Sequence, residues 1–295
     1  MSRFKRVLIV GGTHGNEWTG AYLMRSGTFD ALTQYSFDVV TLLANPRAVA
    51  ANLRYIGRDL NRSFDRQRLN NDRLSHYEDQ QAREIAQRFG ADGDDPVDVI
   101  IDLHTTTADM GSTLILDDES PQALQLAAYL CAVDPSVKVY STSRSGRRDG
   151  LRTIAPLGIC IEVGPVVPGT LDAAAFGQTR SLVMQVLEFL DRVNQAEQSE
   201  CATPLTLYRH LETIDYPRNQ AGQPTAMIHP QLQRQNYQPL HPGDPIFIDF
   251  AGNMMAYAGA ETVYPIFINE VAYYEKGIAF VLTQRQQVDC YGPTA

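Results

Sequence analysis

The sequence lacks the features that mark nucleic-acid-binding and membrane-spanning proteins. Its 34 acidic residues outnumber the 25 lysines and arginines, giving a net charge of −9, whereas a nucleic-acid partner requires a basic surface. No uncharged apolar stretch approaches the ~20 residues of a membrane span. The apolar run Val7–Val10 stops at two glycines and is too short for the core of a signal peptide. We therefore expect neither a nucleic-acid partner nor a membrane partner.

Cysteine is also scarce. The four cysteines, Cys131, Cys160, Cys201 and Cys290, are far apart in the sequence and form no CxxC pair. This spacing indicates neither a disulfide framework nor a thiolate zinc site. We expect reduced thiols in a cytoplasmic protein.

The hydrophobic content is 44%, which is enough to bury a core. The length of 295 residues suggests about two domains. Short branched apolar runs predict buried strands, and these are Val7–Val10, Val99–Ile101 and Ile159–Val163. Helical spacing predicts helices over Glu17–Met24, Tyr77–Phe89, Gln122–Cys131 and Phe176–Asn194, and the polar region Asn61–Asp79 is expected to be a loop. This alternation predicts an α/β fold with a parallel or mixed central sheet and helices on its faces.

The pattern of residues along the sequence changes near residue 200. Beyond a polar stretch the chain consists of short strand-like pieces separated by Pro and Gly, such as His241-Pro-Gly-Asp-Pro245 and the run Val263–Ile268. This pattern predicts a smaller β-rich domain. We expect one α/β domain over residues 1–200 and a second domain over 201–295 that covers the entrance to a site.

The strongest local motif, Gly11-Gly-Thr-His14-Gly-Asn-Glu17, directly follows the first predicted strand. A turn that leads into a helix can orient the imidazole of His14 and the carboxylate of Glu17 toward one point. A catalytic zinc takes three ligands from His, Glu and Asp and keeps one position open. His104 supplies the third, because it follows the second predicted strand and should emerge at the same carboxyl edge of the sheet.

The same motif has two competing interpretations. One is nucleotide binding, which is disfavoured because the glycines do not fit GxGxxG and the chain lacks the lysine of a P-loop. The second is a solvated helix face, for which a His and a Glu three residues apart are typical. The strand-end His104 is the feature that favours a metal site.

A carboxylate, Glu162, interrupts the third predicted strand, Gly158-Ile-Cys-Ile-Glu-Val-Gly164. Buried carboxylates are rarely without a partner, so this residue is either structurally paired or catalytic. The position of Glu162 at a strand end favours the catalytic interpretation. Glu162 would then act as a general base on water and later donate the proton to a leaving amine.

Arginines gather in the segment Arg54-Tyr-Ile-Gly-Arg58-Asp59-Leu-Asn61-Arg62. Guanidinium groups bind carboxylates bidentately and stabilise charge on a carbonyl oxygen, which suits an anionic acyl-amide substrate. The alternative is a solvated loop in which Arg58 and Asp59 pair at the surface. Four more arginines precede Glu162, and some of them are expected to be solvated; they are Arg144, Arg147, Arg148 and Arg152.

Seven ordered motifs resemble a known family over nearly the whole chain. They are GGTHGNE at 11–17, NPRA at 45–48, RDLNR at 58–62, DLHTTT at 102–107, IEVGP at 161–165, HPGDP at 241–245 and NEVAYYEK at 269–276. The chain is similar to the aspartoacylase and succinylglutamate desuccinylase family, which has a zinc carboxypeptidase-like fold. The resemblance implies that His14, Glu17 and His104 bind one zinc ion per chain and that Glu162 activates water.

The resemblance also implies roles in substrate binding. Arg54 would polarise the scissile carbonyl, and Asn61 and Arg62 would hold a substrate carboxylate. Arg152 matches an arginine that binds the side-chain carboxylate of aspartate, and Tyr273 matches a substrate-binding tyrosine. The implied reaction is hydrolysis of N-acetyl-L-aspartate to acetate and L-aspartate. We also expect a homo-oligomer, with a dimer favoured.

Three alternative functions stay open at this point, the first of which is the activity of a related enzyme type. The related aminoacylase-3 type acts on N-acetylated aromatic amino acids and lacks the arginine matching Arg152. A further family tyrosine has no counterpart in the segment Ser145–Arg152, so the pocket is expected to differ in shape. The second possibility is a carboxypeptidase-type exopeptidase. The third is a catalytically silent binding protein, against which the complete set of predicted catalytic residues argues.

Overall fold

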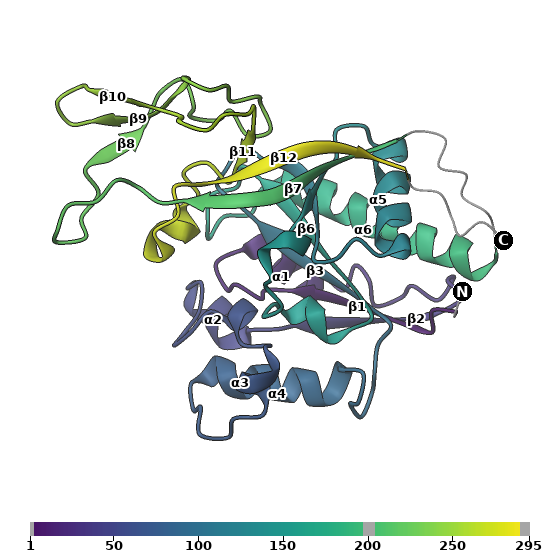
Figure 1. Ribbon diagram of the computed structural model, residues 1–295. Coiled ribbons are helices and arrows are strands. Elements are labelled where there is room, and N and C mark those ends of the chain that lie inside the picture. Colours follow the sequence, from purple (N-terminus) through teal and green to yellow (C-terminus); the bar gives the residue numbers. More distant parts are fainter. Residues whose placement is uncertain (1–2, 197–203, 290–295) are drawn as a thin grey trace.

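The computed structural model describes residues 3–196 and 204–289, and within them nine strands form one mixed sheet at the centre of the molecule (Figure 1). Across the sheet the order is β11 (Tyr264–Ile266), β12 (Phe280–Val288), β7 (Leu205–Ile214), β5 (Lys138–Ser141), β4 (Gly111–Leu116), β6 (Leu157–Gly164), β3 (Val99–Thr105), β1 (Arg6–Gly11) and β2 (Asp38–Leu43). The strands β2, β1, β3 and β6 are mutually parallel, whereas β4 is antiparallel to β6. The predicted central mixed sheet flanked by helices is confirmed.

Helices cover both faces of the parallel half of the sheet because its strands are apolar on both sides. On β1, Val7 and Ile9 pack in one hydrophobic cluster with α1 (Trp18–Arg25), α5 (Pro121–Val133) and α6 (Ala173–Asn194). Leu8 and Val10 point the other way and pack with α4 (Tyr77–Phe89). The two faces of a single strand thus belong to two separate cores.

The predicted elements agree closely with the observed ones. The three predicted strands lie within β1, β3 and β6, and the run Val99–Ile101 is the first part of β3. All four predicted helices exist, with ends shifted by at most a few residues. The region expected to be a loop contains a short helix, α3 (Arg66–Leu69), which forms because Asp65 accepts a hydrogen bond from the Arg68 amide at 3.0 Å and so caps the turn. Another short helix, α2 (Pro46–Ala51), follows β2.

The C-terminal part is rich in strands, as predicted. Its strands β8 (Ala226–Ile228), β9 (Pro245–Asp249) and β10 (Met254–Ala256) form a small antiparallel sheet that projects at the upper left of Figure 1. The long strands β7 and β12 instead extend the central sheet, because β7 pairs with β5. The boundary expected at residue 200 falls within residues 197–203, outside the described residues.

Four short 3₁₀ helices complete the structure of the described residues: η1 (Leu60–Arg62), η2 (Ser143–Ser145), η3 (Leu151–Ile154) and η4 (Val271–Lys276). In Figure 1, the yellow-green coil of η4 lies beneath the left end of β7. Cys160 is a buried free thiol, whereas Cys201 and Cys290 lie outside the described residues. Among the helices of the described residues, none has the length and apolar character needed to cross a membrane.

Candidate active site

The candidate site lies where β1, β3 and β6 end side by side. The register of the parallel strands sets Val10 beside Asp102 and His104 beside Glu162. The turn after β1 carries His14, and Glu17 directly precedes the first residue of α1. Local structure therefore brings the two halves of the predicted ligand set to one edge of the sheet.

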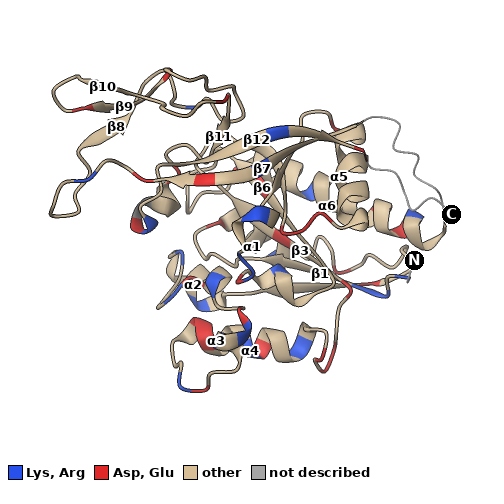
Figure 2. Ribbon diagram, in the orientation of Figure 1, with Lys and Arg blue, Asp and Glu red and all other residues tan. Residues whose placement is uncertain are grey.

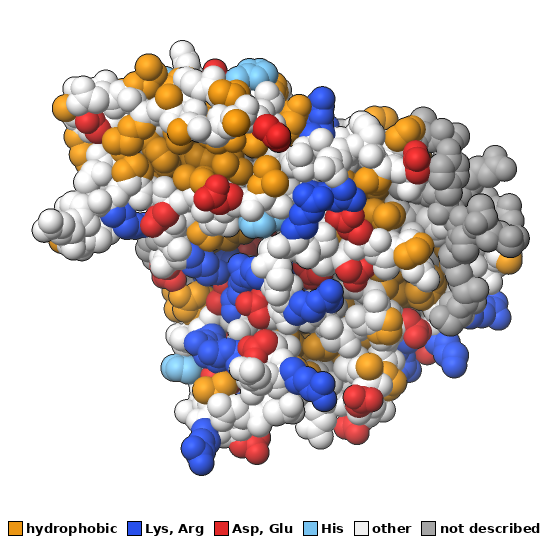
Figure 3. Space-filling model, in the orientation of Figure 1, with side chains coloured by type: hydrophobic (Ala, Val, Ile, Leu, Met, Phe, Trp, Pro, Cys, Tyr) orange, Lys and Arg blue, Asp and Glu red, His pale blue; other side chains and the backbone are white. Residues whose placement is uncertain are grey.

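All nine predicted site residues line one cavity of about 280 Å³. They are His14, Glu17, Arg54, Asn61, Arg62, His104, Arg152, Glu162 and Tyr273. In Figure 3 the middle of the molecular face is hollowed, and blue and red side chains gather around this hollow. In Figure 2 residues of both signs lie close together in the same central region.

His14, Glu17 and His104 form a buried cluster whose ligand atoms all lie within 4.8 Å of one another. The Nδ1 atoms of the two histidines are 3.1 Å apart. The Glu17 carboxylate reaches both, at 2.6 Å from His14 and 2.9 Å from His104. Two imidazole nitrogens and a carboxylate facing one point are a donor set that suits zinc.

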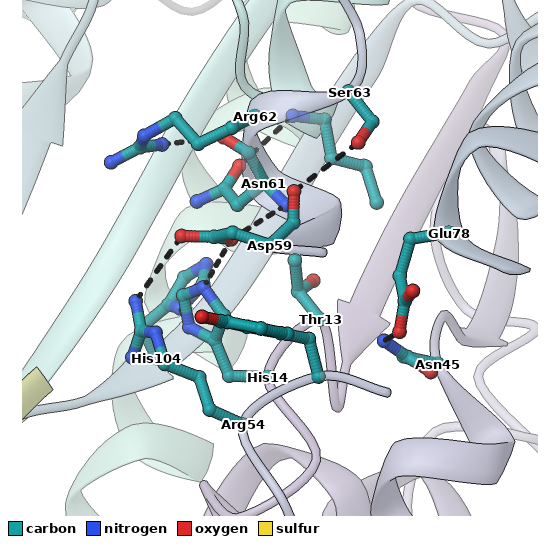
Figure 4. Close-up of polar contacts among 12 residues, drawn as sticks. Thr13, His14, Asn45, Arg54, Asp59, Asn61, Arg62, Ser63, Glu78 and His104 are labelled. Atoms are coloured by element: carbon teal, nitrogen blue, oxygen red, sulfur yellow. Dashed lines mark hydrogen bonds and ion pairs between the residues drawn. The ribbon is translucent and has the colours of Figure 1, made fainter. Parts of the chain in front are cut away.

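Each histidine is held on its far side by another carboxylate. Nε2 of His14 lies 3.0 Å from Asp59 (Figure 4), and Nε2 of His104 lies 2.8 Å from Asp102. In this structure Nδ1 of each histidine bonds to Glu17, and although burial opposes it, Asp102 and Glu17 hold the pKa of His104 well above its ordinary value. With a metal bound, each neutral imidazole would keep its proton on Nε2, toward the carboxylate, and offer the lone pair of Nδ1 to the ion. Thr13 in turn donates to Asp102 at 2.7 Å. The residues present therefore fit a metal ion, because three electron-pair donors converge there.

The charges of the cluster favour an anionic Glu17. Burial alone would raise its pKa, but His14 and His104 hold the pKa of Glu17 well below its ordinary value. Burial likewise opposes ionisation of Asp59, yet His14 and the cations Arg54 and Lys276 keep the pKa of Asp59 far below its usual range. The carboxylates around the histidines are thus ionised at neutral pH.

Glu162 has the opposite environment. Burial raises the pKa of Glu162 to about 8, and the nearby His104 offsets this effect only in part. The carboxyl group is therefore poised to exchange a proton near neutrality, and a cation bound at the adjacent cluster would favour its ionised form. A carboxyl group of this kind beside a candidate metal site can act in general acid–base chemistry.

Arg54 lies directly against the cluster and donates to Glu17 at 3.1 Å. Its Nε is buried without a hydrogen-bond partner, and the Nε atoms of Arg62 and Arg152 are in the same state. Arg152 also donates to Asp117 at 2.6 Å, which raises the pKa of Arg152 against the effect of burial. Three arginines, each with one Nε donor that has no partner, thus line one cavity, as expected for a site that binds carboxylates.

Asn61 and Tyr273 complete the predicted wall. The Asn61 side-chain oxygen accepts from the Leu151 amide at 3.0 Å, which ties η1 to η3. The Tyr273 ring packs on Phe267 at 5.3 Å between centroids, and burial raises the pKa of the Tyr273 hydroxyl. The part of the cavity wall that contains Phe267 and Tyr273 comes from the C-terminal part of the chain.

The interpretation of Arg58 and Asp59 as a surface pair is wrong. Asp59 is buried and contacts His14, and Lys276 donates to it at 2.7 Å. Arg58 instead faces Asp79 at 3.6 Å. Among the arginines before Glu162, Arg147 joins Arg152 at the cavity, while Arg144 and Arg148 are exposed.

Several residues of the site were not predicted from the sequence. Asp102 carried a usable signal, because it lies two residues before His104 and side chains at this spacing share one face of a strand. Glu270 gave no such signal: its carboxylate accepts from the Thr107 amide at 2.7 Å and the Ala108 amide at 3.1 Å, more than 160 positions away. Asp117, the partner of Arg152, is likewise defined only by the fold.

A candidate metal site and a buried carboxyl group at one edge of an α/β sheet are the arrangement expected of a metal-dependent hydrolase. The chain matches the succinylglutamate desuccinylase/aspartoacylase catalytic domain over residues 3–190 and the barrel-sandwich hybrid domain of the same group over 203–285. The chain therefore belongs to the succinylglutamate desuccinylase/aspartoacylase family, and it is an amidohydrolase enzyme.

Relatives of two specificities resemble the chain over nearly their full length. It is 46% identical to a Nostoc sp. protein named "Probable aspartoacylase", covering 98% of this chain and 99% of that one. It is 41% identical to the Homo sapiens N-acyl-aromatic-L-amino acid amidohydrolase (carboxylate-forming), over 95% and 91% of the two chains. The crystal structure of murine aminoacylase 3 matches with a TM-score of 0.90 and 37% identity, covering 98% of this chain and 97% of that one.

Proposed function

We propose that this amidohydrolase deacylates small N-acyl amino acids and that its preferred substrate is N-acetyl-L-aspartate, which yields acetate and L-aspartate. The observation that carries the proposal is the single cavity in which the His14, Glu17 and His104 cluster, Glu162 and three guanidinium groups meet. N-acetylaspartate carries two carboxylates beside its amide, and each can be bound by an arginine.

We propose one zinc ion per chain, held by His14, Glu17 and His104. A bound zinc would supply Lewis-acid polarisation of the substrate carbonyl and of water. Glu162 would take a proton from the attacking water and deliver it to the leaving nitrogen, a role that its raised pKa supports. Arg54 would stabilise negative charge on the carbonyl oxygen, since it lies beside Glu17 with an unused donor.

The remaining residues would orient the substrate. Asn61 and Arg62, at the end of the segment that carries Arg54, would hold the α-carboxylate. Arg152 would bind the side-chain carboxylate, and Asp117 keeps its guanidinium in place. Tyr273 would add a hydroxyl contact from η4.

The C-terminal part, residues 201–295, is proposed to restrict the entrance. Lys276 of η4 bonds to Asp59, and the Tyr55 hydroxyl donates to Glu275, so η4 is tied to the opposite wall. A cavity bounded in this way favours small acyl amino acids over peptides, although a carboxypeptidase-type exopeptidase remains the alternative that peptide substrates would test. The small number and wide spacing of the cysteines support a cytoplasmic location, and a homo-oligomer, with a dimer favoured, stays a prediction.

A second candidate is deacetylation of N-acetylated aromatic amino acids. It is favoured by an apolar stretch of the cavity wall that includes Ile115, Phe267, Ile278 and Val281, and by the similarity to murine aminoacylase 3. An aromatic side chain could pack on this wall without a charged partner. The two candidates therefore differ in whether Arg152 or the apolar wall receives the substrate side chain.

The test is a panel of N-acetyl amino acids with acidic, aliphatic and aromatic side chains, scored by release of free amine. We expect the highest kcat/KM for N-acetyl-L-aspartate and a selective loss for that substrate in Arg152→Lys, because a point charge cannot reproduce bidentate binding. Preference for an aromatic substrate, or an Arg152→Lys enzyme with unchanged kinetics on N-acetylaspartate, would reject the aspartate assignment. Release of C-terminal residues from peptides would favour the exopeptidase.

A further inference from the structure

A carboxylate outside the cavity binds the segment that carries the substrate-binding arginines. Glu78, in the first turn of α4, is fully buried at 0% exposure. Its Oε1 accepts from the Ile56 amide at 2.6 Å and from the Asn45 side chain at 3.3 Å, the latter drawn in Figure 4. Its Oε2 accepts from the Gly57 amide at 3.0 Å and the Arg58 amide at 3.1 Å. These four donors occupy the four lone-pair sites of a carboxylate.

The three amides belong to consecutive residues in a segment without regular structure. Among the residues that the structure describes, the amides of Ile56, Gly57 and Arg58 meet no other acceptor. The chain reaches this segment from α2, which is followed by Asn52 in the left-handed region, and leaves it at η1. Glu78 therefore supplies the acceptor for every one of the three amides.

The segment matters because functional side chains flank the three amides on both sides. Arg54 precedes them by two residues, and Asp59, which holds His14, follows them directly. Asn61 and Arg62 come next, in η1. A shift of the three amides would therefore move both the guanidinium beside Glu17 and the groups at the opposite wall.

We propose that Glu78 is a positioning residue of the active site: by binding three consecutive amides it fixes the segment 54–62, and with it Arg54, Asn61 and Arg62, in the geometry that the reaction needs. The proposal rests on the proposed deacylase function for its kinetic consequences. Its structural consequence, an ordered backbone at 56–58, is independent of any substrate. The competing explanation is that Glu78 only stabilises the packing of α4.

The kinetic test compares Glu78→Gln and Glu78→Asp with Glu84→Gln, an exposed change on the same helix. Glutamine has the same shape as glutamate, but its NH₂ group would face the three backbone N–H donors. Aspartate keeps the carboxylate on a side chain that is shorter by one methylene. We expect kcat/KM of metal-saturated Glu78→Gln to fall about 10- to 100-fold, the cost of misplacing reacting groups by about 1 Å. Both kinetic parameters should change. We expect a lower kcat because Arg54 is displaced, and a higher KM because Asn61 and Arg62 are displaced.

Glu78→Asp should fall between the wild type and Glu78→Gln, and Glu84→Gln should match the wild type. A purely stabilising residue would lower the melting temperature and leave the kcat and KM of the folded, metal-saturated fraction unchanged. That result would overturn the proposal.

Hydrogen exchange supplies a readout that does not depend on activity or on a variant folding. In the wild type the amides of Ile56, Gly57 and Arg58 should exchange slowly although they lie in a surface-exposed segment; in Glu78→Gln their protection should be lost while that of β1 and β3 is kept. Rapid exchange of these amides in the wild type would refute the proposal outright. A wild type that is inactive on every N-acyl amino acid but protected at 56–58 would instead refute the proposed function and leave the anchoring role supported.

Discussion

At the scale of single residues, the site works through contrasting carboxylates. Glu17, Asp59 and Asp102 each bond to an imidazole, whereas Glu162 has no such partner among the described residues and is buried beside other acids. The first three are ionised: Glu17 is a candidate metal ligand, and Asp59 and Asp102 hold the two candidate histidine ligands. The fourth keeps a proton more tightly and can transfer it, because environments that separate pKa values separate the roles of chemically identical groups.

Replacing Glu162 by glutamine should separate catalysis from metal binding. We expect Glu162→Gln to keep its metal, because the three candidate ligands are intact, and to lose at least ~10²-fold in kcat, the lower range for general acid–base catalysis. Steady-state kinetics with parallel metal analysis would check this. Near-normal turnover of a metal-loaded variant would remove Glu162 from the mechanism.

The raised pKa of Glu162 also predicts a pH effect on the metal-free protein. A carboxyl group whose pKa is 4.5 when unfolded and about 8 when folded binds more protons in the folded state, so stability is full below the lower value and is lost as pH rises through the higher one. At about 1.36 kcal/mol per unit, the loss is at most about 5 kcal/mol. Because glutamine does not titrate, the stability of the Glu162→Gln variant has no such dependence on pH at this position.

Thermal unfolding of the metal-free proteins should therefore show the melting temperature of Glu162→Gln rising relative to the wild type between about pH 5 and pH 8.5, the range over which the two pKa values separate. A difference that stays constant over this range would mean that Glu162 is not held protonated in the folded protein.

At the scale of elements, sequence patterns located strands and their ends but not the contacts between distant loops. His14 and His104 could be placed together because parallel strands end at one edge. Asp59 could not, since its contacts to His14 and Lys276 span 45 and 217 positions. Branched apolar runs and helical spacing are local signals, whereas the pairing of polar side chains across loops is set by tertiary packing.

The docking of η4 gives a test at this scale. Glu270, just before η4, is buried and accepts from Thr106, Thr107, Ala108 and the Ala272 amide. Because Glu270→Gln puts a donor against these donors, we expect a stability loss of about 1–3 kcal/mol, the cost of unsatisfied buried groups, together with a higher KM through Tyr273. Denaturant unfolding and steady-state kinetics would measure the two effects.

An exposed substitution on the same short helix is the matched control for that experiment. Val271 is 49% exposed, and Val271→Ala should leave both quantities close to those of the wild type. Equal behaviour of Glu270→Gln and Val271→Ala would mean that η4 is held in place by other contacts.

At the scale of the whole molecule, the C-terminal part both completes the central sheet and supplies one wall of the cavity. Strands β7 and β12 join the sheet, while Phe267, Tyr273 and Lys276 reach the cavity. Folding of residues 204–289 and assembly of the site are thus linked. The small sheet β8–β10 projects away from the cavity (Figure 1). Exposed apolar side chains lie on this sheet and on the turn between β9 and β10 (Figure 3), among them Met227, Met254 and, in the turn, Phe250.

Metal-dependent hydrolysis at the His14, Glu17 and His104 cluster is the central claim about the whole enzyme. The direct measurement is amine release from N-acetyl-L-aspartate by purified protein that has been stripped with a chelator and then titrated with zinc. We expect no release from the stripped protein and activity that returns in proportion to zinc, reaching its plateau at one ion per chain. Full activity in the stripped protein, or no recovery with zinc, would contradict the claim.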